Sequence, residues 1–355
     1  MGVLDLQLHR EVPPSATPPT TISDLIAHYK QAELSPVRSQ SEESDEFEKA
    51  YSTKKAYRIF LDRWIEPRWG RYRIDEIRTI AVEQWLRDLT LDQGRRMARG
   101  TKAKIRNIFH SIFNHAIRWQ WLPQNANPIS KVRQSSKRER VPEVLDAVEI
   151  QALLSQLSLR DRMVVALAAT TGLRRGELFG LKWSDVDFEK HQISVTRSIV
   201  QQVVGRCKTE ASQKPVPLYP GLAEDLKVWK QTTEYGRPDD WIFASARKNG
   251  RQPLWPDTLL SQVILPAAKR AGITKNLGFH TFRRSFATLL KANGEDVKVV
   301  QELMRHANSK ITLDTYAQAL SPAKRQAQIK LAELILPRKQ SDWLDSGSHE
   351  SEEYK

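Results

Sequence analysis

The sequence has almost no cysteine and no long apolar stretch. Its one cysteine, Cys207, excludes an intramolecular disulfide and a cysteine-rich zinc site, as is typical of proteins of the reducing cytoplasm. The longest apolar stretch, residues 163–169, is far too short to cross a bilayer, and the first residues show no basic segment followed by an apolar run. We therefore expect a soluble, cytoplasmic protein without a membrane partner.

Two kinds of phosphate chemistry also lack their usual residues. The sequence has no glycine-rich loop of the Walker type, which would cradle a nucleoside triphosphate. Nor does it have a cluster of paired acidic residues to hold two magnesium ions, or any other visible metal cluster. We expect a protein that uses no cofactor and no metal.

Positive charge is what the sequence has in excess. Lysine and arginine total 56 against 42 aspartate and glutamate, a net charge of +14. Residues 51–140 hold 21 basic and 8 acidic side chains, a net +13 that is nearly the whole excess. Two interpretations remain open for this region: solvated helix faces, or a surface that displaces condensed counterions from a DNA backbone.

The N-terminal third predicts a disordered tail and then a helical bundle. Residues 1–20 contain four prolines among small polar residues and cannot bury enough apolar surface to order. Residues 39–48 are acidic and serine-rich and predict a loop. Apolar residues recur at helical spacing near residues 22–29, from residue 52, over 80–89 and over 101–122.

These helices predict a small helical bundle over residues 21–130. Its tryptophans are expected to be core residues rather than platforms for stacking bases: Trp64, Trp69, Trp85, Trp119 and Trp121.

A basic run without periodicity, KVRQSSKRER at residues 131–140, comes next and is followed by Pro142. This composition predicts a linker over residues 131–143 that could lie along DNA phosphates. The candidate DNA-binding residues of the bundle and linker are Lys102, Lys104, Arg106, Lys131, Arg133, Lys137 and Arg138.

The pattern after the linker predicts a second domain over residues 144–336, mainly α-helical with a small antiparallel β-sheet. Short strands are indicated between residues 192 and 218, with Gly205 as a turn-forming residue. Helices are expected over residues 222–232, 257–271, 281–292, 297–306, 312–320 and 323–334. A polar tail follows at residues 337–355.

Local signals at the start of this domain place one arginine in rigid surroundings. Asp146 and Glu149 have the spacing of a helix cap, and an apolar helix over residues 162–171 is stopped by Gly172. Arg174 follows in TTGLRRGELFGLKW and opens another turn. Alone, such an arginine is usually a surface or salt-bridged residue.

Further polar residues follow in order. His280 and Arg283 stand three apart in FHTFRRSFAT, so they share a face at a helix N-terminus, which favours phosphate. His306 lies in LMRHA, and Tyr316 follows ten residues later in LDTYAQ. Each residue taken singly is ordinary, but the ordered set is not.

The ordered set resembles the catalytic domain of the tyrosine recombinases, the phage-integrase family, over residues 144–334. The helical region before it is similar to the family's SAM-like core-binding domain. The family pattern falls on Arg174, Lys208, His280, Arg283, His306 and Tyr316. Glu177 matches a supporting acidic position, whereas Arg284 stands where a second histidine is frequent and Arg305 where glycine is common.

The resemblance implies a DNA strand-exchange enzyme. Tyr316 would attack a DNA phosphate while Arg174 and Arg283 stabilise the charge on its oxygens. The product would be a 3′-phosphotyrosyl link, which stores the energy of the broken bond and is resealed by a 5′ hydroxyl without ATP.

Proton transfer is implied for the remaining residues. His280 would receive the proton of the tyrosine, and His306 would hydrogen-bond the phosphate. Lys208 on a hairpin would protonate the departing 5′ oxygen; Lys182 and Lys214 lie nearby, but the segment CKT followed by PVPL favours Lys208.

The implied partner is a double-stranded recombination site in the nucleoid, bound by a homotetramer that exchanges strands through a Holliday junction. An excisionase or a host DNA-bending protein would be an accessory partner, as for a mobile element. The helix over residues 323–334 could be exchanged between subunits or fold back on its own.

Two other functions remain open at this point. A catalytically silent DNA-binding protein would bind DNA without forming a covalent adduct. A type IB topoisomerase would share the cleavage chemistry but would relax supercoils without joining two sites.

Overall fold

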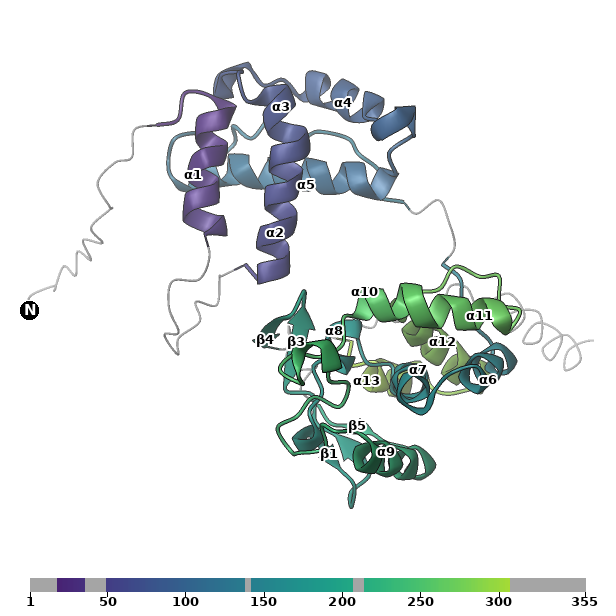
Figure 1. Cartoon of the computed structure of the whole chain (residues 1–355). Coiled ribbons are helices and arrows are strands. Elements are labelled where there is room, and N and C mark those ends of the chain that lie inside the picture. The colour runs from purple at the N-terminus through teal and green to yellow at the C-terminus, as the bar shows by residue number, and fades with distance from the viewer. Residues whose placement is uncertain (1–17, 36–48, 138–141, 207–213, 307–355) are drawn as a thin grey trace, which may run out of the picture. The chain divides into compact units, whose positions relative to one another are not determined.

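A computed structural model describes residues 18–35, 49–137, 142–206 and 214–306 (Figure 1). The chain divides into two compact units, residues 1–140 and 141–355, and each is described by itself. Predictions that fall on residues 1–17, 39–48, 312–320, 323–334 and 337–355 lie outside the described residues. Of the helices that are described, none combines the length and apolar character needed to span a bilayer.

The first unit is helical, as predicted. Its helices are α1 (Ile22–Leu34), α2 (Tyr51–Phe60), α3 (Glu66–Trp69), α4 (Thr79–Asp88) and α5 (Arg99–Arg118), with a π-helical turn at Leu61–Ile65 and 3₁₀ turns at Ile74–Glu76 and Asp92–Gly94. Thr21 caps α1, because its hydroxyl accepts from Asp24 N at 3.2 Å while the Asp24 carboxylate accepts from Thr21 N. The helix runs five residues past the predicted end because Leu34 still lies in the core.

Aromatic side chains fill the core of this unit. Trp69 is buried and meets Trp85 edge-on, with 5.7 Å between ring centroids. Trp64 and Trp121 are partly buried against the same core, and Trp119 stacks on Trp121. The prediction that the tryptophans are structural is confirmed by these contacts.

The segment predicted as a linker begins as part of this unit. Val132 is buried in the core, and the backbone N–H of Arg133 donates to Glu83 Oε1 at 2.7 Å. The basic segment that begins at residue 131 is therefore attached to the first unit at its start.

The second unit is mainly helical. It contains α6 (Ala147–Ser155), α7 (Leu159–Thr171), α8 (Arg175–Leu178), α9 (Pro220–Thr232), α10 (Pro256–Leu259), α11 (Leu265–Arg270), α12 (Phe279–Ala292) and α13 (Val297–Leu303). A π-helical turn at Leu260–Ile264 joins α10 to α11, and 3₁₀ turns lie at Trp183–Asp185 and Ala246–Lys248.

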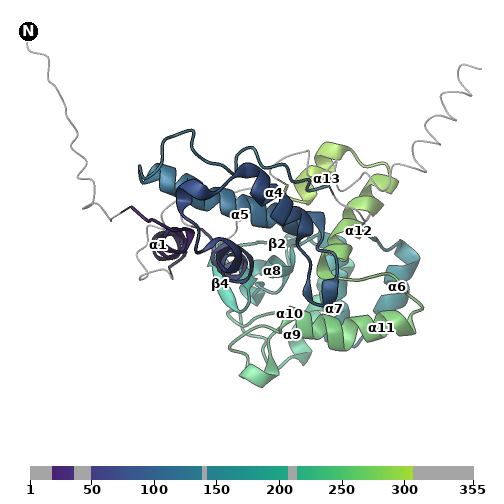
Figure 2. The ribbon, with the colours of Figure 1, turned by 90° about the horizontal axis from the view of Figure 1, so that it is seen from above.

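Helix α7 is central to this unit. It contacts α6, α8, α9 and α12, and α12 lies beside it (Figure 2). Because it is surrounded, α7 is buried over most of its length, from Met163 to Ala169 without interruption. The predicted cap of α6 is present, since Asp146 Oδ1 accepts from Glu149 N at 2.8 Å.

The β-structure consists of two small antiparallel sheets. Strands β1 (Val186–Asp187), β2 (Gln192–Ile193) and β5 (Val216–Pro217) form one in the order β1-β2-β5, and β3 (Arg197–Val200) pairs with β4 (Val203–Arg206) in the other. The assignment of Gly205 to a turn was wrong, because Gly205 lies inside β4 opposite Ser198. The turn is formed by Gln201 and Gln202, whose φ angles of 51° and 64° suit a two-residue hairpin.

Candidate active site

Arg174 is fixed at the junction of α7 and α8. Helix α7 ends at Gly172, whose φ of 61° is left-handed and whose hydrogen in place of Cβ avoids a 2.6 Å approach to Phe286. Two residues later Arg174 is the N-cap of α8, and its backbone N–H donates to Glu177 Oε2 at 2.9 Å. Its side-chain Nη1 donates to Glu177 Oε1 at 2.8 Å. The Arg174 guanidinium is thus held by a carboxylate three residues later in the same turn.

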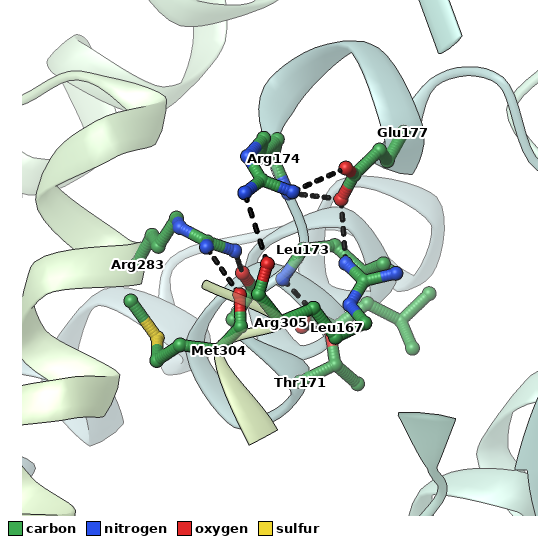
Figure 3. Close-up of polar contacts among 9 residues, drawn as sticks. Leu167, Thr171, Leu173, Arg174, Glu177, Arg283, Met304 and Arg305 are labelled. Atoms are coloured by element: carbon green, nitrogen blue, oxygen red, sulfur yellow. Dashed lines mark hydrogen bonds and ion pairs between the residues drawn. The ribbon is translucent and has the colours of Figure 1, made fainter. Parts of the chain in front are cut away.

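Arg283 is the fifth residue of α12 and is buried, with 5% of its surface exposed. Its Nη1 donates to the carbonyl oxygen of Gly172, and its Nη2 donates to the carbonyl oxygen of Met304 at 2.5 Å (Figure 3). One side chain therefore connects the ends of α7 and α13.

The turn that ends α13 receives both arginines. The backbone N–H of Arg305 donates to Glu302 O at 2.9 Å, and that of His306 donates to Gln301 O at 3.1 Å. This pair of bonds is a Schellman motif, and it places Arg305 in the left-handed region with φ of 50°. Helix α13 consequently ends at Leu303. The prediction that it continues to His306 was wrong. The Arg305 carbonyl accepts from Arg174 Nη2 at 3.2 Å.

Arg305 also contributes its side chain, which was not predicted as part of the site. The residue is 2% exposed, and its Nη2 lies 2.5 Å from Glu177 Oε2 (Figure 3). The only signal in the sequence was an arginine where the family commonly has glycine. Burial alone would raise the pKa of Glu177, but the guanidinium groups of Arg305 and Arg174 outweigh it and hold the pKa below its ordinary value.

The two histidines are kept neutral near pH 7. Partial burial and the positive charges of Arg284 and Arg283 lower the pKa of His280, an exposed residue on the first turn of α12. Half-burial, with Arg283 and Arg174 nearby, lowers the pKa of His306 to about 4. A neutral imidazole can both accept and donate a proton.

The cluster carries an excess of positive charge. Three guanidinium groups, those of Arg174, Arg283 and Arg305, face one carboxylate, that of Glu177. Burial, then Arg174, lowers the pKa of Arg283 to about 9, which leaves it protonated at neutral pH. A buried cationic excess favours a bound anion.

The structure therefore brings together Arg174, Glu177, Arg283 and His306 around one turn, with His280 on the same turn of α12 as Arg283. Lys208 and Tyr316 lie outside the described residues. Lys182, the alternative to Lys208, places its ammonium 5.0 Å from the ring centroid of Trp241.

The residues predicted to bind DNA in the first unit differ in exposure. Lys104, Lys131, Arg133 and Lys137 are exposed, and Arg138 lies outside the described residues. Arg106 Nη2 donates to the carbonyl oxygens of Ile129 and Ser130. Lys102 is buried, with its ammonium 2.6 Å from the Arg87 carbonyl oxygen, a structural contact that its sequence context did not indicate.

Comparison with known proteins identifies the family. The model of the phage integrase family matches residues 137–321, more than half of the chain, and the chain belongs to this family. The protein is a tyrosine-type site-specific recombinase that acts on DNA.

Its curated relatives are tyrosine recombinases. One from Pseudothermotoga lettingae is 28% identical over 261 residues, which cover 73% of this chain and 84% of that protein. Tyrosine recombinase XerA of Pyrococcus furiosus is 24% identical over 269 residues, 74% of this chain and 82% of that protein.

Solved structures show the same fold. The Tn1549 transposon integrase in complex with a circular intermediate DNA superimposes with a TM-score of 0.68 at 20% identity, covering 88% of this chain and all of that one. A lambda integrase tetramer bound to a Holliday junction gives 0.59 at 21% identity, covering 84% of this chain and 78% of that one. The predicted fold class, mainly helical with small antiparallel sheets, is thereby confirmed.

Proposed function

We propose that this recombinase cuts and rejoins DNA through a 3′-phosphotyrosyl intermediate formed by Tyr316. The observation that carries the proposal is the anchoring of Arg174 and Arg283 on the carbonyl oxygens of adjacent residues, Arg305 and Met304, within a cluster of net positive charge. Such an arrangement suits one phosphate held by two guanidinium groups.

The proposed chemistry places these arginines on the scissile phosphate. Attack by a phenol builds negative charge on the non-bridging oxygens, and preorganised cationic donors stabilise that charge most. Arginine is suited to this because it stays protonated and binds two oxygens in a fixed fork. Arg174 keeps 34% of its side chain exposed, so part of its guanidinium is available to substrate.

Proton transfer is assigned to the remaining residues. The Tyr316 hydroxyl, with an ordinary pKa near 10, gives its proton to His280 as its oxygen bonds to phosphorus. Lys208 donates a proton to the 5′ oxygen as the phosphorus–oxygen bond breaks. His306 hydrogen-bonds the phosphate. The low pKa of both histidines supports their roles, because each is neutral before the anionic substrate binds.

Resealing follows by the reverse reaction, in which the 5′ hydroxyl of a partner strand attacks the phosphotyrosine and Tyr316 leaves. Two rounds on two duplexes require four active sites, so we propose a homotetramer that exchanges strands through a Holliday junction. The helix predicted over residues 323–334 would either pass between its subunits or fold back on its own subunit.

Phosphate contacts from the first unit, the proposed core-binding domain of residues 21–130, would supply much of the affinity. A cavity of about 350 Å³ supports this role. Its lining includes five cationic residues, namely Arg87, Arg96, Arg99, Lys102 and Arg133. The basic segment of residues 131–143 would continue this contact, and residues 144–336 would form the catalytic domain.

The proposal is tested with nicked duplexes that carry the recombination site, since loss of the short cleaved strand traps the covalent adduct. Wild-type protein should form an adduct resistant to denaturant, and Tyr316→Phe should form none while binding the DNA equally well. An adduct with the Phe variant would exclude Tyr316 as nucleophile. DNA binding without any wild-type adduct would indicate a silent binding protein, and relaxation of supercoils without joining of two sites a topoisomerase.

A further inference from the structure

Arg305 occupies a backbone conformation that ordinarily belongs to glycine. It is the residue after the C-cap in the Schellman motif that ends α13, with φ of 50°. A side chain with Cβ is strained there, and strain of this kind persists where surrounding contacts enforce it. The side chain is nevertheless 2% exposed, so it is packed inward and not left in solvent.

The contacts of this side chain lead to the active-site carboxylate. Arg305 Nη2 lies 2.5 Å from Glu177 Oε2, while Arg174 Nη1 lies 2.8 Å from Glu177 Oε1. Glu177 is 4% exposed on its side chain, so water does not compete for these bonds. Each oxygen of one buried carboxylate therefore has its own guanidinium.

The sharing of Glu177 between two arginines raises the net positive charge of the cluster that a substrate would meet. Without Arg305, the charge of Glu177 would be compensated mainly by Arg174, and the net charge of the remaining three side chains would fall to +1. With Arg305 present, two guanidinium groups share the charge of Glu177, and the four side chains of Arg174, Arg283, Arg305 and Glu177 together carry a net charge of +2. The main chain of Arg305 also orients Arg174, since the Arg305 carbonyl accepts from Arg174 Nη2.

We infer that Arg305 is a positioning residue of the cleavage reaction, which shares the charge of Glu177 and so keeps the guanidinium of Arg174 oriented toward the scissile phosphate in a cluster of higher positive charge. The inference rests on the proposed function, because it names the phosphate as the anion.

Arg305→Gly is the first variant that tests this. Glycine relieves the backbone strain at φ of 50° but also removes a buried ion pair, so the Tm of every variant is measured and the rates are compared well below the lowest Tm. We expect adduct formation on the nicked duplex to slow about tenfold, with the Kd for DNA nearly unchanged because many phosphates contribute to it. Arg305→Lys, which keeps the charge, should recover part of the rate.

The double variant Arg305→Gly with Glu177→Gln separates positioning from packing. Removing the unbalanced carboxylate should make the double variant faster than Arg305→Gly alone, although it carries one more substitution. A purely structural role predicts that the two losses add. A wild-type rate for Arg305→Gly, or a double variant slower than the single one, would overturn the inference.

A second measurement needs no cleavage. Inorganic phosphate is titrated into the DNA-free protein, and the imidazole NMR signals of His280 and His306 are followed. Wild type should bind phosphate several-fold more tightly than Arg305→Gly, and the double variant should regain affinity. If wild type forms no adduct but the phosphate affinities of the three proteins follow this order, the proposed function fails while the positioning role stands. Equal phosphate affinities for wild type and Arg305→Gly would contradict the positioning role alone.

Discussion

Arg174 Nη2 donates to the backbone carbonyl of Arg305 at 3.2 Å, across 131 positions of sequence. A carbonyl oxygen accepts but carries no net charge, so this bond orients the guanidinium without neutralising it. Arg283 is held in the same way by the carbonyl oxygens of Gly172 and Met304. Arg283 is therefore oriented by backbone atoms, whereas Arg174 is oriented by one backbone carbonyl and by the Glu177 carboxylate.

Arg283→Lys should abolish most cleavage. A lysine ammonium cannot reach the carbonyls of Gly172 and Met304 and also present a planar fork to phosphate. We expect adduct formation to fall about 100-fold or more, as for loss of a donor that stabilises developing charge. The measurement is single-turnover adduct formation on the nicked duplex.

Arg162→Lys is the matched control for that variant. Arg162 also donates to two backbone carbonyls, those of Leu154 and Leu157, but it is exposed. Its lysine variant should cleave at the wild-type rate. Equal loss in both variants would mean that the effect of Arg283→Lys is one of folding.

The first unit should lose stability in mild acid because of its paired histidines. His28 Nδ1 lies 2.9 Å from His115 Nε2, and burial, opposed by Glu33 and assisted by Arg118 and His28, lowers the pKa of His115 to about 4. The unfolded chain binds the proton near pH 6.5, so stability is complete above that pH and falls as the pH drops toward 4. A shift of this size corresponds to about 3 kcal/mol.

Denaturant unfolding at pH 7.5 and pH 5, followed by tryptophan fluorescence, measures this loss. His115→Gln should reduce stability at pH 7.5 but flatten its dependence on pH. Equal wild-type stability at both pH values would show that the pair does not titrate in this range.

Binding to duplex DNA should weaken steeply with salt, and exposed lysines of the first unit should account for part of the slope. Lys104→Ala removes one exposed cation of α5, and the slope of log K against log salt should fall by about 0.9 if it contacts a phosphate. Lys227→Ala changes the net charge equally at a lysine paired with Glu224, 2.8 Å away, and should leave the slope unchanged. Identical slopes for both variants and wild type would remove Lys104 from the interface.

The parts of the site that the sequence predicted depend on local chain geometry. Gly172 ends α7 and Arg174 begins α8 within three residues, and His280 and Arg283 share one helical turn. Such relationships follow from spacing alone. The fold class followed in the same way from periodic apolar residues.

What the sequence did not predict depends on distant partners. The role of Arg305 required knowing that Glu177, 128 positions earlier, lies beside it. The burial of Lys102 depends on a carbonyl 15 residues away, and the hairpin turn at Gln201–Gln202 follows from pairing in which Gly205 faces Ser198. Helical spacing and turn propensity contain none of this information.

The bonds that tie Arg283 and Arg174 to the end of α13 also constrain when the enzyme becomes active during its synthesis. Carbonyl acceptors at Met304 and Arg305 leave the ribosome long after Arg174 has emerged. Contacts between such distant positions form late, because closing long loops is slow. A nascent or truncated chain that lacks this turn lacks the carbonyl acceptors of Arg174 and Arg283, so under the proposed function it would not cleave DNA.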